Sequence, residues 1–91
     1  MKKLHDLEHG SARPLIVIQI RAKLPHLQGV IQKVGQFYLG LSYEEAAQMS
    51  IRDAARASGT SEAAISRFVK EMGVDSFKVF RESFLKTSSK E

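Results

Sequence analysis

The chain has 91 residues, of which 43% are hydrophobic and 26% are charged, as in a single soluble globular domain. It contains no cysteine, which excludes disulfides and thiolate metal sites and is typical of a cytoplasmic protein. The longest apolar run, residues 15–18, is far shorter than the roughly 20 residues that a membrane-spanning helix needs. The acidic residues Asp6 and Glu8 argue against an N-terminal secretory signal.

The net charge is +4 and is divided equally between residues 1–49 and 50–91. A basic protein favours a polyanionic partner, but a nonspecific nucleic-acid coat usually carries its charge in one block. We therefore expect a fold that places a few cations at chosen phosphates.

Residues 1–13 are polar, and we predict a flexible N-terminal arm. Pro14 suits the first position of a helix, which should run to about Leu24 because Pro25 interrupts it. The β-branched run Ile16-Val17-Ile18 leaves a strand as the alternative. A second helix is predicted from Leu27 to about Leu39.

Two glycines lie inside the second predicted helix, and a third lies at its end. Gly29 and Gly35 each cost roughly 1 kcal/mol relative to alanine in a helix interior. Gly40 should end this helix.

A capping-box sequence follows, in which Ser42 precedes Glu45 by three residues. It predicts a short helix from Tyr43 to about Gln48. Ser50 and Asp53 begin the next helix in a similar way.

The most informative pattern lies in residues 50–72, where a glycine separates two apolar stripes. Both stripes follow the i, i+3, i+4, i+7 spacing of one helical face: Ile51, Ala54, Ala55 and Ser58, then Ile65, Phe68, Val69 and Met72. Gly59 can end the first helix in the left-handed conformation, and Ser61 can cap the second. Ala55 is small enough for the two helices to cross closely. The pattern predicts a helix-turn-helix with Ser61–Met72 as its second helix, and a plain helical hairpin is the alternative.

Beyond this motif Gly73 should end the helix, and Asp75 can cap the last one. The last helix carries a predicted core stripe of Phe77, Phe80, Phe84 and Leu85. Residues 87–91 are polar and should form a frayed C-terminal tail, so the folded domain is predicted to span residues 14–86. The predicted fold is an all-α, compact bundle of about five or six short helices.

The residues quoted for the helix-turn-helix, together with Gly73 and the segment 76–81, resemble the N-terminal DNA-binding domain of RpiR-type bacterial transcription regulators. The resemblance extends more weakly upstream and covers about residues 15–86. It implies about five helices, a DNA-reading helix at Ser61–Lys70, and control of genes of sugar or amino-sugar metabolism. Regulators of this type usually act as dimers, so a homodimer is expected.

The sequence departs from this family at four positions: Gly35, Thr60, Ala64 and Val74. Gly35 and Thr60 are expected to weaken packing, and Ala64 removes one possible phosphate contact. Family members usually continue into a sugar-isomerase-like domain that senses a phosphosugar and holds the dimer. The sequence leaves open whether this chain is one domain of a longer protein or a short relative, so a phosphosugar effector is expected only with such a domain.

Catalytic and metal-binding patterns are weak. His5 and His9 are four residues apart but have no evident third ligand, and Glu44 and Glu45 point to different sides of a helix. We therefore predict no enzyme activity, no cofactor and no metal.

Two functions remain. The first is a regulator that binds double-stranded DNA, and the second is a helical protein-interaction module that uses exposed Phe or Leu residues of the first or last helix. If the protein is a DNA-binding regulator, six residues should face the major groove: Ser61, Glu62, Ala63, Ser66, Arg67 and Lys70. The candidate phosphate contacts are Arg52, Thr60 and Lys78.

Overall fold

The computed structural model describes residues 13–86, which form helices and no strands. The elements are α2 (Leu15–Lys23), the 3₁₀-helix η1 (Leu24–His26), α3 (Gly29–Leu39), α4 (Tyr43–Gln48), α5 (Ile51–Ser58), α6 (Glu62–Glu71) and α7 (Phe77–Ser83). The all-α prediction is therefore confirmed. The predicted arm, apart from Arg13, and the predicted tail lie outside the described residues.

α2 is a helix, so the alternative strand is wrong. Its buried residues Ile16, Val17 and Ile20 follow helical spacing, and they pack into the core as one face. Pro14 precedes this helix as its N-cap residue instead of opening it. The break predicted at Pro25 takes the form of the short turn η1, and α3 then begins at Gly29 rather than at Leu27.

Serine side chains begin each of the four helices from α4 to α7. The hydroxyls of Ser42, Ser50, Ser61 and Ser76 each accept a hydrogen bond, over 3.0–3.2 Å, from the backbone N–H three residues later. Such a cap typically stabilises a helix by about 1 kcal/mol. The capping box at Ser42 is confirmed, but Asp75 as the cap of α7 is wrong because Ser76 fills that position.

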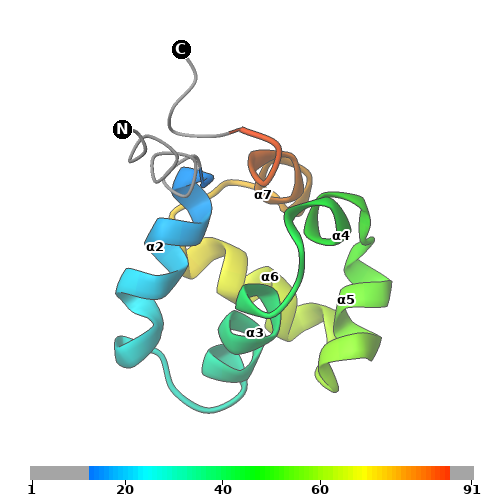
Figure 1. Cartoon of the computed structure of the whole chain (residues 1–91). Coiled ribbons are helices and arrows are strands. Elements are labelled where there is room, and N and C mark those ends of the chain that lie inside the picture. The colour runs from blue at the N-terminus through cyan, green and yellow to red at the C-terminus, as the bar shows by residue number, and fades with distance from the viewer. Residues whose placement is uncertain (1–12, 87–91) are drawn as a thin grey trace.

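α6 lies at the centre of the bundle (Figure 1). It packs against α3, α5 and α7, while α2 lies beside η1, α3 and α7. In Figure 1, α2 and α5 lie on opposite sides of α6. The position of α6 therefore depends on its contacts with three other helices.

Aromatic rings fill the centre of this packing. The buried Phe68 ring of α6 stacks on Tyr38 of α3 at 6.1 Å between centroids and meets Phe80 of α7 edge-on at 5.7 Å. Phe84 continues the cluster, stacked on Tyr38 at 5.7 Å. The Tyr38 hydroxyl has no hydrogen-bond partner among the described residues, and burial raises its pKa, against a smaller lowering by the charge of Arg81.

The predicted core stripe of α7 is only partly right. Phe80 and Phe84 are buried and Phe77 is half-buried, but Leu85 is 66% exposed. The helix ends at Ser83 with Phe84 as its C-cap, so Leu85 no longer follows the helical spacing that the prediction assumed.

Gly35 of α3 faces side chains from η1 and from α6. A Cβ atom there would lie 2.8 Å from Leu24 Cδ1 and 3.2 Å from Phe68 Cε1, closer than ordinary van der Waals contact. The missing side chain therefore leaves room for Leu24 of η1 and Phe68 of α6 to pack against α3. The expectation that Gly35 weakens packing stays a prediction.

The turn between α5 and α6 requires a left-handed residue. Gly59 has φ 72°, and the N–H groups of Gly59 and Thr60 donate to the carbonyl oxygens of Arg56 and Ala55 at 3.2 and 2.9 Å. These two bonds satisfy the last carbonyls of α5. The predicted role of Gly59 is confirmed.

Replacing Phe68 by alanine should remove the ring that joins α3, α6 and α7. We expect Phe68→Ala to lower the free energy of unfolding by about 3–5 kcal/mol, a large part of the stability of a domain of this size. Urea unfolding followed by circular dichroism measures this loss. A loss below about 1 kcal/mol would contradict the described orientation of α6.

Replacing Gly59 by alanine should destabilise the domain by about 1–2 kcal/mol, because a Cβ atom is strained in the left-handed conformation. Gly40 is the matched control, since it ends α3 with φ −90° and a Cβ there meets only ordinary contacts. Gly40→Ala should be neutral or stabilise by up to about 1 kcal/mol. Equal effects of the two substitutions in thermal melts would contradict the left-handed turn.

Candidate nucleic-acid interface

α5 and α6 meet through small side chains. Ala54, Ala55 and Ser58 of α5 are buried, as is Ala64 at the start of α6. Small residues at a helix crossing let two backbones approach closely. Together with the left-handed Gly59, this contact produces the predicted helix-turn-helix.

α6 has one buried face and one exposed face. Ala64, Ile65, Phe68 and Val69 are buried, and Met72, which caps the helix, is buried too. The second helix is slightly shorter than the predicted Ser61–Met72, because these two residues are its caps. The structure brings to the exposed face the six predicted groove-facing residues: Ser61, Glu62, Ala63, Ser66, Arg67 and Lys70.

The three predicted phosphate contacts come from different elements. Arg52 is exposed in the first turn of α5, and Lys78 is exposed in the first turn of α7. Thr60 is half-buried, and its hydroxyl lies 2.7 Å from that of Ser58 in a hydrogen bond. This bond joins the Thr60 hydroxyl to the end of α5, and the expectation that Thr60 weakens packing stays a prediction.

Lys33 was not among the predicted residues, although it lies beside the turn. Its Nζ atom is 3.3 Å from the position that a Cβ would take at Gly59. Lys33 belongs to α3 and is exposed. Sequence spacing could not reveal this neighbour, because it depends on how α3 crosses the motif.

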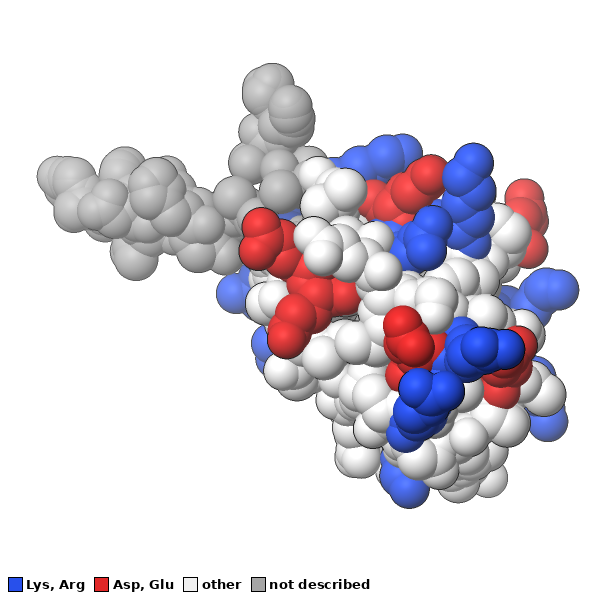
Figure 2. All heavy atoms as spheres, turned by 90° about the vertical axis from the view of Figure 1, so that its right-hand side faces the viewer, with Lys and Arg blue, Asp and Glu red and all other residues white. Residues whose placement is uncertain are grey.

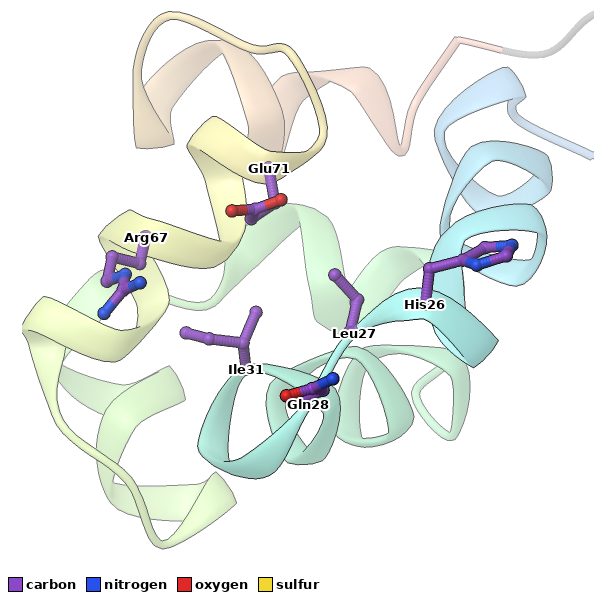
Figure 3. Close-up of a pocket in the computed structure, with 6 residues that line it drawn as sticks. All are labelled: His26, Leu27, Gln28, Ile31, Arg67 and Glu71. Carbon is purple, nitrogen blue, oxygen red and sulfur yellow. The ribbon is translucent and has the colours of Figure 1, made fainter.

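A shallow pocket borders the exposed face of α6. It has a volume of about 220 Å³ and is lined by His26, Leu27, Gln28, Ile31, Arg67 and Glu71. Figure 3 shows Arg67 and Glu71 projecting from α6, and Gln28 and Ile31 across the pocket from them. Sequence reasoning identified only Arg67 of these as a site residue.

Arg67 and Glu71 are four residues apart on α6, a spacing at which opposite charges often pair. In the described part of the chain the structure forms no ion pair between them. The guanidinium of Arg67 therefore remains available to an external ligand.

Basic and acidic side chains are interspersed on the motif. α5 and α6 carry Arg52, Arg56, Arg67 and Lys70 together with Asp53, Glu62 and Glu71. Figure 2, which turns the right-hand side of Figure 1 toward the viewer, also shows blue and red side chains side by side instead of one basic block. The charge pattern therefore differs from that of a uniform polyanion-binding surface.

Within residues 13–86 no cluster of three or more His, Cys, Asp or Glu side chains could hold a metal ion. The His5–His9 pair lies outside the described residues. Over the same part of the chain, every helix is too short or too polar to cross a bilayer.

Comparison with curated proteins and with solved structures gives no significant match. Comparison with protein families matches residues 16–91 to the helix-turn-helix domain of the rpiR family. The matched segment contains every described helix except the first residue of α2. The chain therefore belongs to the rpiR family of DNA-binding helix-turn-helix domains.

Proposed function

We propose that this protein is a sequence-specific transcription regulator that reads the DNA major groove with α6. The observation that carries the proposal is the division of this helix into a fully buried apolar face and an exposed face of small and polar residues. An α-helix of ordinary diameter fits the major groove, where each base pair presents a distinct pattern of donors and acceptors.

The exposed residues of α6 have the chemistry for this role. Ala63 lets the backbone approach the DNA, and Ser66 can bond a base edge or a phosphate. Arg67 can bond O6 and N7 of guanine at once, and Glu62 can accept a hydrogen bond from cytosine N4. The hydroxyl of Ser61 already caps α6, so its second lone pair and its proton remain for the DNA.

Phosphate contacts would hold the domain in register. We assign this role to Lys70 on α6 and to Arg52, Thr60 and Lys78 on the neighbouring elements. The three cations among these residues, Lys70, Arg52 and Lys78, would release counterions from DNA on binding, which supplies affinity without sequence preference.

The wider biology of the proposal rests on the family. We propose a bacterial, cytoplasmic homodimer that controls genes of sugar or amino-sugar metabolism. A phosphosugar effector belongs to the proposal only if the chain is joined to a sensor domain. We assign no catalytic role, cofactor or metal to the chain.

One observation favours a second role as a protein-interaction module. Leu15 and Ile18, one turn apart on α2, are 60% and 42% exposed. Apolar side chains in this arrangement suit contact with another helix. Phe80 and Phe84 of the last helix are buried, so they do not offer the exposed surface that was expected for contact with another protein. Contact of a second protein with α2 is compatible with DNA binding through α6.

DNA binding should depend strongly on salt. We expect Lys70→Ala to weaken binding to many sequences alike and to lower the slope of log K against log salt by about 0.9, because one phosphate contact is lost. Fluorescence anisotropy over a salt series measures this slope. Lys86→Ala, at the exposed end of the described chain, is the control and should leave the slope unchanged. A wild-type affinity that does not vary with salt would contradict the proposal.

Arg67 should determine the choice of one base pair in each half-site. On the preferred site, obtained by selection from genomic fragments, Arg67→Ala should cost roughly 1–3 kcal/mol of binding free energy. The affinity of this variant for nonspecific DNA should fall much less than its affinity for the preferred site. Binding to a library of single-base variants measures both effects. An equal loss across the library would make Arg67 a phosphate contact and assign sequence reading to its neighbours.

A further inference from the structure

We propose that the junction between η1 and α3 is a second DNA-contacting element, in which the side-chain amide of Gln28 donates to a phosphate of the strand beside α6. This inference rests on the proposed function and extends it to a segment outside the helix-turn-helix. It is carried by the position of the junction, its attachment to α6 and the chemistry at its tip.

The junction lies beside α6, across the pocket from Arg67. A helix of about 10–12 Å diameter fills a major groove about 12 Å wide, so the elements on its two flanks meet the two phosphate strands. α5 packs against α6, and the junction faces α6 across the pocket that Arg67 borders (Figure 3). The DNA strand on this flank of α6 would therefore meet the junction.

Hydrogen bonds hold the junction in place on α3 and α6. The side-chain amide of Gln32 donates to the carbonyl oxygens of Leu24 and Leu27, both at 3.2 Å, which fixes η1 on the first turn of α3. Lys23, at the end of α2, donates from Nζ to the carbonyl oxygen of Glu71 at 3.0 Å. The Leu27 side chain is buried beneath the junction. The junction thus keeps a fixed position relative to α6 before any DNA binds, which lowers the entropy lost on binding.

The junction carries an exposed hydrogen-bond donor. Gln28 is exposed, and its side chain makes no hydrogen bond in the described part of the chain. An amide NH₂ group has two donors and commonly bonds phosphate oxygens. The Glu71 carboxylate also borders the pocket and repels a phosphate from its interior. The contact is therefore made from the wall that carries Gln28, opposite the α6 wall that carries Glu71 (Figure 3).

Charge substitutions at Gln28 test the contact directly. Gln28 precedes α3 without a side-chain cap bond, so its substitution should leave the fold intact, which thermal melts can check. Gln19, exposed on α2, is the matched control. Binding of the full chain to a mixed-sequence duplex of about two helical turns is measured by fluorescence anisotropy over a salt series.

We expect Gln28→Lys to bind about tenfold more tightly at low salt and to steepen the log–log salt slope by about 0.9, since it adds one phosphate charge contact. Gln28→Glu should bind about tenfold more weakly. Gln19→Lys and Gln19→Glu should stay within about twofold of wild type, because Gln19 borders a different pocket, which Val74 and Lys86 also line. A charge outside the contact is largely screened by salt.

Equal effects at Gln28 and Gln19 would overturn the inference. If Lys70→Ala still lowers the salt slope in that case, the proposed function stands and only the junction contact fails. If the wild-type protein shows no salt-dependent binding, the proposed function fails and the inference fails with it.

Discussion

The burial of Phe68 is the constraint on which the rest of this structure depends. Its ring contacts Tyr38 from α3 and Phe80 from α7, so one side chain of α6 is held by two other helices. Because residues on a helix are offset by about 100°, fixing Phe68 inward also fixes Arg67 and Lys70 outward. The core thereby determines which side of α6 a ligand meets.

This core carries one unfavourable feature. The Tyr38 hydroxyl is buried without a partner among the described residues, and such a group typically costs about 1–3 kcal/mol. The same ring makes contacts with Phe37, Phe68, Phe80 and Phe84. Aromatic pairs contribute about 0.5–1.5 kcal/mol each beyond the area that they bury, which offsets the unpaired hydroxyl.

Local sequence signals predicted much of the fold, because they act within one or two turns of a helix. Serine caps, the left-handed Gly59 and the apolar spacing of α6 all belong to this kind. The errors at Asp75 and Leu85 came from a helix boundary displaced by one residue or two. Neither the approach of Lys33 to the turn nor the pocket opposite Arg67 could be predicted, since both depend on how α3 crosses α6.

The interspersed charges of the motif have a consequence for recognition. Glu62 and Glu71 lie on the exposed side of the same helix as Arg67 and Lys70, so the net charge offered to DNA is small. An acidic side chain near a phosphate is repelled, whereas one near a cytosine amino group is accommodated. If α6 lies in the major groove as proposed, these carboxylates therefore weaken binding at a wrong position on the DNA more than they weaken binding at the correct site. Specificity then depends on repulsion as well as on attraction, and both require the fixed rotation of α6 that its buried face provides.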